Sequence, residues 1–289
     1  MPEDQKNQPN DIGRRDFVLT VGAGLAATSA SAEAAAEGAK DVVETDVEIK
    51  TPDGTCDAAF IHPSSGSHPG VLLWPDAFGL RPSMRGMAKR LAASGYSVLV
   101  PNPFYRVTKA PFTDASKFDF KNKDDFAKIM PLMASVNAAG AAEKDAVAYV
   151  GFLDAQKQVN KSRKIGTQGY CMGGALVVRT SATVPDRIGA GASFHGGGLV
   201  KDTPDSPHLL APKIKANMYF GIASNDDAKQ PDAKDKLKEA FPTAEVEVYA
   251  TCLHGWCVPD MPMQDGKPIY NQPEADRAWS KLLALYKSL

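Results

Sequence analysis

The chain has 289 residues, of which 43% are hydrophobic, and its formal net charge at pH 7 is -1. That length suffices for one large domain with a sizeable core or for two small domains. Acidic and basic residues number 34 and 33, and no Lys/Arg block interrupts that balance, which argues against a broad cationic surface for nucleic acid. A small molecule or a macromolecule of another kind is the better expectation for its substrate.

Residues 1–32 have the features of an export signal. Arg14 and Arg15 are followed by the letters DFV and a modestly apolar, Gly/Ala-rich run, and ASA at 30–32 has the A-x-A form of a cleavage site. This pattern resembles a twin-arginine signal, and the alternative is an alanine-rich tail. The run is too short and too weakly apolar to stay in a membrane as a span. On the export interpretation, the domain comprises 33–289, folds before the twin-arginine machinery carries it across, and works in a periplasm.

The first predicted elements are two antiparallel strands, at 41–51 and 57–63, on either side of the turn signal PDG. GVLLWP at 70–75 is a short, continuous apolar run of the kind that a strand buried on both faces needs. A helix with Pro at its start and Gly at its end follows at 82–95, and a second buried strand follows at 96–101. The pattern thus changes from an antiparallel hairpin to alternating strands and helices.

The stretch 102–124 is rich in Pro, Phe, Lys and Asp without a clear period, which predicts a loop near the strand ends and a candidate lid. After it the alternation resumes. Helices are predicted at 124–136 (with a Pro inside), 143–157, 173–182, 231–241 and 274–289, and strands at 164–170, 188–196, 215–224 and 245–251. Such alternation, with wholly apolar strands, predicts an α/β fold whose mainly parallel sheet is covered by helices on both faces.

The letters GYCMGG place Cys171 directly between a predicted strand and a predicted helix. A sharp strand-to-helix turn puts its central residue at the carboxyl end of the sheet in a strained conformation, and Gly169 and Gly173 are small enough to flank it. The first N–H groups of the helix would favour a thiolate and stabilise an oxyanion there. These features favour a nucleophile. The alternative is an inert buried thiol, with glycines that serve only helix–strand packing.

A nucleophilic thiol needs a base, and the base needs a group that orients it. His254 follows the last predicted strand, and Asp226 and Asp227 follow the strand before it. The chain order nucleophile, acid, histidine is that of the α/β-hydrolases. The alternatives are a turn histidine held by backbone groups and, for one of the two aspartates, a helix N-cap.

Together these residues resemble the dienelactone hydrolases, the cysteine branch of the α/β-hydrolases. The likeness runs from GVLLWPDAFGLRPSMRGMAKRLAASGYSVLVPNPFYR through GTQGYCMGG to ATCLHGW. It implies a catalytic triad of Cys171, His254 and one aspartate, with Asp226 favoured over Asp227 by the position of the family's acid. It also implies a cofactor-free, usually monomeric single domain that opens lactones or cleaves simple carboxylic esters.

The resemblance extends to WPDAFG, where the family commonly has a glutamate that activates the thiol when substrate arrives. Here that position is Asp76, which is one methylene shorter and is also suited to a turn that caps the next helix. The resemblance implies that the backbone N–H groups of Ala77 and Met172 form the oxyanion hole.

Arginines in the family meet the carboxylate of muconate-type lactones. Arg106 matches one of them, whereas GWCVPD after His254 holds no arginine for the other. We therefore expect a more apolar pocket, although any of its aromatic residues is equally suited to the core. The expected lining is Trp74, Phe78, Phe104, Tyr105 and Trp256.

His195 also follows a predicted strand, the one after the Cys171 unit. Its place in the chain precedes the acid, so a role in lining the pocket or in the structure is favoured over that of a second base.

Other functions stay open at this point. Cys252, His254 and Cys257 supply three soft ligands within a short loop, but their spacing matches no established zinc pattern, so no metal site is predicted. A disulfide between Cys252 and Cys257 is the stronger alternative, and it would stiffen the loop that carries the base. An exported general carboxylesterase and a binding protein without turnover are the remaining candidates for a chain of this fold.

Overall fold

The computed structural model describes residues 40–119 and 121–289. The predicted export signal at 1–32 lies outside these residues. Within the described part of the chain, no helix has both the length and the apolar character needed to cross a membrane.

Eight strands of the described residues form one sheet, in the order β1-β2-β4-β3-β5-β6-β7-β8. β1 pairs antiparallel with β2, and β2 pairs antiparallel with β4, whereas every other neighbouring pair is parallel. The strands are β1 (Val42–Thr51), β2 (Gly54–Pro63), β3 (Gly70–Trp74), β4 (Ser97–Pro101), β5 (Ile165–Tyr170), β6 (Ile188–Phe194), β7 (Asn217–Ala223) and β8 (Glu245–Tyr249). The predicted α/β fold with a mainly parallel sheet is confirmed.

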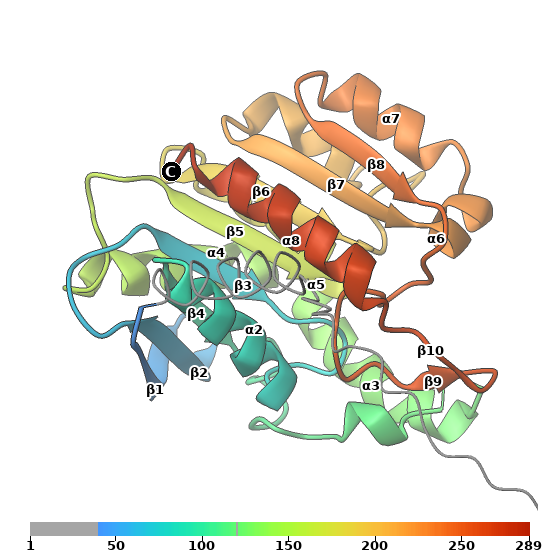
Figure 1. Cartoon of the computed structure of the whole chain (residues 1–289), viewed down its shortest axis with the longest axis horizontal. Coiled ribbons are helices and arrows are strands. Elements are labelled where there is room, and N and C mark those ends of the chain that lie inside the picture. Colours follow the sequence, from blue (N-terminus) through green and yellow to red (C-terminus); the bar gives the residue numbers. More distant parts are fainter. Residues whose placement is uncertain (1–39, 120) are drawn as a thin grey trace, which may run out of the picture. The chain divides into compact units, whose positions relative to one another are not determined.

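Helices cover both faces of this sheet because its central strands are apolar on both sides; every residue of β3, β4 and β5 is buried. The helices are α2 (Pro82–Ala93), α3 (Lys123–Asn137), α4 (Ala141–Ala155), α5 (Met172–Thr183), α6 (Ser224–Lys229), α7 (Ala233–Ala240) and α8 (Gln272–Tyr286). The buried side chains of α2 and α8 share one hydrophobic cluster, and those of α3, α4, α5 and α7 share another. Figure 1 shows α2 and α8 in front of the sheet, with α4 and α5 behind it.

Several short elements were not predicted. They are α6, the 3-10 helices η1 (Ala115–Lys117) and η2 (Pro207–Lys213), and the two-residue strands β9 (Met263–Gln264) and β10 (Lys267–Pro268). Of these, α6 matters most for the site, because it begins directly after β7 and carries both candidate acids. It is too short to produce a periodic apolar pattern.

Register brings the candidate residues together at the carboxyl ends of the parallel strands. Trp74 of β3 is the register partner of Gly169 on β5, and Tyr170 of β5 is the partner of Phe194 on β6. The loops after β3, β5 and β6 therefore begin side by side. In an open α/β sheet this edge is where ligands bind.

Candidate active site

Cys171 occupies a strained turn between β5 and α5. Its φ and ψ are 53° and -116°, a combination that residues with a side chain rarely adopt, so the surrounding structure must hold it in place. The turn also depends on close backbone contacts. A Cβ atom at Gly173 would lie 2.5 Å from the carbonyl oxygen of Trp74, and one at Gly169 would collide with the carbonyl of Gly173. Both glycines are thus required sterically.

Hydrogen bonds fix the backbone of Cys171 on both sides. Its N–H donates to the carbonyl oxygen of Phe194 and to Nδ1 of His195, each at 3.1 Å. Its carbonyl oxygen accepts from the N–H groups of Gly174 and Gly197, each at 3.0 Å. The turn is therefore tied both to its own helix and to the loop that follows β6.

His254 lies in the loop after β8, and its Nδ1 is 2.7 Å from Oδ2 of Asp226. The start of α6 holds this loop, since the His254 N–H donates to Oδ1 of Asn225 at 2.9 Å, and Ser224 donates to the Cys252 carbonyl from both its N–H and its hydroxyl. The same short helix thus supplies the carboxylate and anchors the loop that carries the imidazole.

The electrostatics of His254 depend on Cys171. Burial disfavours the charged ring, but its interactions with the Cys171 side chain and the Asp226 carboxylate outweigh burial and raise the pKa of His254 to about 10. The structure thus brings Cys171, His254 and Asp226 together in that order. A thiol, an imidazole and a carboxylate connected in this way are able to transfer an acyl group.

Asp76 lies in the loop after β3 and is held by an arginine. Its carboxylate accepts from two nitrogens of Arg81, at 2.7 and 3.0 Å, and from the N–H of Phe78, at 2.9 Å. Arg81 also binds Asp260 through Nε and Nη2, at 2.7 and 2.8 Å. Asp76 and Arg81 are 1% and 3% exposed, so the charges of Asp76 and Arg81 form a buried pair.

This arrangement links the loop after β3 to the loop after His254. Burial lowers the pKa of Arg81, but its contacts with Asp76 and Asp260 prevail and raise it. Neither Arg81 nor Asp260 was among the site residues predicted from the sequence. Arg81 was visible as the residue before the proline that begins α2, but nothing local indicates Asp260, because the contact spans 179 positions.

The two expected oxyanion donors belong to adjacent strand ends. Ala77 follows Asp76 in the loop after β3, and Met172 is the first residue of α5. Because Trp74 and Gly169 are register partners, these two segments begin next to each other. Both residues are buried.

Arg106 lies in the loop after β4, where carboxylates occupy its guanidinium. Its Nη1 and Nη2 each donate to Asp145 at 2.8 Å, and Nη2 also donates to Asp53 at 2.9 Å. Asp145 is fully buried on α4. Arg106 therefore ties the β1–β2 turn to α4 in this structure.

The expected pocket aromatics are mostly core residues. Trp74, Phe104 and Trp256 are fully buried, and Phe78 is 3% exposed. The Trp74 indole donates to Thr180, and the Trp256 ring stacks on Tyr249 at a centroid distance of 4.5 Å. The hydroxyl of Tyr105 donates to the carboxylate of Asp145.

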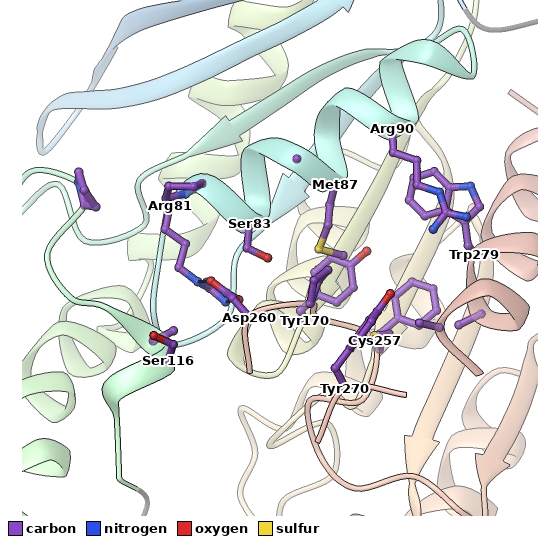
Figure 2. Close-up of a pocket in the computed structure, with 18 of the residues that line it drawn as sticks. Arg81, Ser83, Met87, Arg90, Ser116, Tyr170, Cys257, Asp260, Tyr270 and Trp279 are labelled. Atoms are coloured by element: carbon purple, nitrogen blue, oxygen red, sulfur yellow. Dashed lines mark hydrogen bonds and ion pairs between the residues drawn. The ribbon is translucent and has the colours of Figure 1, made fainter. Parts of the chain in front are cut away.

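A cavity of about 680 Å³ lies between α2 and α8 (Figure 2). Tyr170 and Phe194, which precede Cys171 and His195 in the chain, line it, whereas Cys171, Asp226 and His254 do not. Figure 2 shows Met87 of α2 facing Tyr170, and Arg90 beside Trp279. A smaller cavity of about 50 Å³ touches Asp226 and Asp227. Neither cavity contains all three of these side chains, so cavity size does not point to the strand ends where they meet.

The loop after β8, which carries Cys252 and Cys257 and is called the cysteine loop below, contains neither a disulfide nor a group of metal ligands. All four cysteines are free thiols. Cys252 and Cys257 are buried, and the structure has no disulfide between them, contrary to that alternative. Both side chains pack in the apolar cluster under α2 and α8. Among the described residues, no three His, Cys, Asp or Glu side chains are grouped so that they could hold a metal ion.

Comparisons with known proteins find related sequences and structures. The model of the dienelactone hydrolase family matches residues 56–289. A carboxymethylenebutenolidase of Rhodococcus opacus is 29% identical over 216 residues, which cover 72% of this chain and 78% of that protein. A putative carboxymethylenebutenolidase of Methylorubrum extorquens is 26% identical over 285 residues, covering 94% and 91%. The crystal structure of a putative dienelactone hydrolase from Klebsiella pneumoniae has a TM-score of 0.71 at 18% identity, covering 86% of this chain and 100% of that one.

Proposed function

Because the chain belongs to the dienelactone hydrolase family and is a hydrolase of esters or lactones, we propose that Cys171, His254 and Asp226 carry out that hydrolysis. The observation that supports this proposal most directly is the 2.7 Å contact between His254 Nδ1 and Asp226 Oδ2, in a site where the imidazole also interacts with the Cys171 side chain. A carboxylate at Nδ1 fixes the tautomer and leaves Nε2 for the thiol.

In the first step the Cys171 thiolate attacks the carbonyl carbon, and a tetrahedral oxyanion forms. The N–H groups of Ala77 and Met172, at adjacent strand ends, stabilise this charge. The imidazolium of His254 then protonates the alkoxide as it leaves. The products of this step are an alcohol, or the opened lactone, and a thioester on Cys171.

The second step is hydrolysis of the thioester, and it depends on the groups that stabilise the proton on His254 in the first step. Burial opposes its charge, and the Cys171 thiolate is the largest contribution in its favour. Once the sulfur carries an acyl group, that negative charge is gone, so the pKa of His254 falls and the neutral ring can take a proton from water. Hydroxide attack on the thioester releases the acid and restores the thiolate–imidazolium pair.

We propose small, uncharged esters and lactones as the substrates. Arg106, the residue that matches a carboxylate-binding arginine of the family, is bound by Asp145 and Asp53, and no arginine follows His254 in GWCVPD. A substrate carboxylate would have to displace a buried carboxylate from Arg106. General carboxylesterase activity is therefore the second candidate beside lactone opening.

Hydrolysis of a short-chain aryl ester and of a simple enol lactone tests these proposals, with Cys171→Ala, His254→Ala and a chelator control measured in parallel. Removal of either residue lowers kcat by about 10⁴-fold or more, and the chelator has no effect. Full activity in Cys171→Ala would refute the nucleophile. A lactone cleaved efficiently only when it carries a carboxylate would refute the substrate class.

We also propose that residues 1–32 direct export through the twin-arginine machinery, which the residue pattern around Arg14 and Arg15 supports. Replacement of both arginines by lysine should retain the protein in the cytoplasmic fraction of an expressing bacterium. Unchanged periplasmic recovery of that variant would contradict the proposal.

A further inference from the structure

His195 emerges from the sheet directly beside Cys171. Tyr170 and Phe194 are register partners on β5 and β6, so the next residue of each strand is the one that begins the turn. Both turn residues have positive φ, 53° at Cys171 and 41° at His195. The N–H of His195 donates to the carbonyl oxygen of Gly221 on β7 at 2.7 Å. His195 is thus anchored to the neighbouring strand on the side away from Cys171.

The side chain of His195 contacts the backbone of the nucleophile. Its Nδ1 accepts the N–H of Cys171 at 3.1 Å. An accepting Nδ1 must carry a lone pair, so the ring is neutral and its hydrogen is on Nε2. The protonation state of this histidine is therefore coupled to the position of the Cys171 amide.

The same ring packs against the base. The His195 and His254 rings meet edge to face with centroids 4.7 Å apart, and Trp256 contacts His195 in the same manner at 5.3 Å. Tyr170 lies on another side with its centroid at 6.1 Å. One side chain, 0% exposed, thus contacts both the amide of the nucleophile and the ring of the base.

We propose that His195 is a positioning residue for Cys171 and His254: it holds the nucleophile's amide and sets the distance between thiol and imidazole. This inference rests on the proposed function, since it acts through the Cys171–His254 pair. In this role the His195 side chain positions two reacting groups and does not line the substrate pocket.

Two unfavourable features of His195 indicate that packing alone does not explain its presence. Its buried Nε2 has no hydrogen-bond partner among the described residues, and leaving such a group unpaired is unfavourable. Its positive φ adds strain for a residue that has a Cβ. Glycine would remove both costs at this position. Unsatisfied groups and strained backbone gather at functional sites, where geometry matters more than stability.

The electrostatic surroundings of His195 keep its Nδ1 unprotonated, so that it can accept the N–H of Cys171. Burial and the neighbouring His254 hold the pKa of His195 well below its usual range. The residues in contact with it that carry titratable side chains are His254, from the loop after β8, and Cys171 and Tyr170, from the end of β5; Cys171 makes this contact through its backbone N–H. His195 consequently stays neutral while His254 carries the proton, and Nδ1 remains an acceptor.

Three substitutions distinguish the effect of the hydrogen-bond acceptor at His195 from the effect of its strained backbone. His195→Asn keeps an acceptor near the position of Nδ1 and tolerates positive φ, His195→Leu has the shape of Asn without the acceptor, and His195→Gly relieves the strain without the acceptor. We expect Gly and Leu to lower kcat about 10- to 100-fold with little change in KM. Asn should restore about 10-fold of that loss. His68→Asn, in the loop before β3, is the control for a histidine outside the site.

The second readout is the pH profile of Cys171 alkylation by iodoacetamide, followed by peptide mapping. Cys171 is the one cysteine of the four that is not buried, which makes it the site of first labelling. Slower labelling at neutral pH in Gly and Leu, with recovery in Asn, supports positioning. A purely structural role would change the melting temperature and leave this profile as in wild type.

Three results would overturn the inference: kcat and alkylation in His195→Gly within about 2-fold of wild type, Asn as impaired as Leu, or losses that only follow the folded fraction. Cys171→Ala, measured alongside, tests the proposed function separately. If that variant keeps full activity, the nucleophile is wrong. If it is inactive while His195→Gly is not, only the positioning role fails.

Discussion

Asp226 and Asp227 are neighbours in α6, yet the protein uses their carboxylates in different ways. Asp226 binds Nδ1 of His254 at 2.7 Å, whereas Asp227 binds the ammonium group of Lys234 at 2.8 and 3.0 Å. The Asp227 pair connects α6 to α7 at the partly exposed surface. The contacts thus favour Asp226 over Asp227 as the acid of the proposed triad.

Exchange of each aspartate for asparagine tests this difference. Asp226→Asn should lower kcat by about 10³- to 10⁴-fold, because an amide no longer fixes the tautomer of His254 or stabilises its charge. Asp227→Asn removes only a surface ion pair and should stay within about 2-fold of wild type. Steady-state kinetics on one aryl ester compare the two, and an equal loss in both would exclude this assignment.

The charge of His254 should depend on the sulfur of Cys171. In wild type the pKa of His254 is raised to about 10, against the effect of burial, chiefly by the Cys171 side chain. In Cys171→Ala that side chain is absent and burial persists, so the pKa should fall toward the ordinary value of about 6.5. The ring therefore loses its proton at lower pH in the variant. NMR titration of the His254 ring measures both values, and identical titrations would contradict this effect of Cys171.

The turn at Cys171 should not tolerate a side chain at Gly173. A methyl group there would lie 2.5 Å from the Trp74 carbonyl oxygen, a backbone atom that cannot move freely. Gly173→Ala should destabilise the protein by about 3 kcal/mol and abolish ester hydrolysis. Gly151→Ala is the matched control, because an added Cβ on α4 meets nothing within 4 Å, and it should stabilise the helix by about 1 kcal/mol. Thermal and urea unfolding give the two values; equal stabilities would refute the steric argument.

The pair of Arg81 and Asp76 should contribute more to stability than a surface pair. Arg81→Met leaves Asp76 as a buried, uncompensated carboxylate and should cost about 3–5 kcal/mol of unfolding free energy. Arg85, four positions along α2, pairs with Glu44 and Asp46 in a more exposed setting. Arg85→Met should therefore cost less than about 1 kcal/mol. A comparable loss in both variants, measured by urea denaturation, would show that burial does not govern the difference.

Thiol counting tests the state of the cysteine loop. The structure has four free cysteines, so the protein unfolded without reductant should react with four equivalents of a thiol reagent. Cys252→Ser should then give three. Two equivalents from wild type would reveal a disulfide between Cys252 and Cys257 and would make the loop that carries His254 stiffer than the structure has it.

Much of the fold was predictable from short stretches. The apolar run of β3, the Pro-to-Gly helix α2 and the turn GYCMGG each contain their own signal, because burial on both faces, capping and glycine spacing act between neighbours in the chain. The same holds for the order of Cys171, the aspartate pair and His254. Those local patterns were sufficient for an α/β sheet with a candidate nucleophile at its carboxyl edge.

Tertiary structure alone decided the partners. Which aspartate meets His254, that Arg81 binds Asp260, and that His195 accepts the amide of Cys171 all depend on which strand and loop ends become neighbours in space. These contacts join residues 28, 179 and 24 positions apart, and no local pattern encodes them. The sequence by itself determined which chemical groups the strand ends carry; the packing of the sheet determined which of them touch, because side-chain contacts follow from strand register and loop path rather than from residue type.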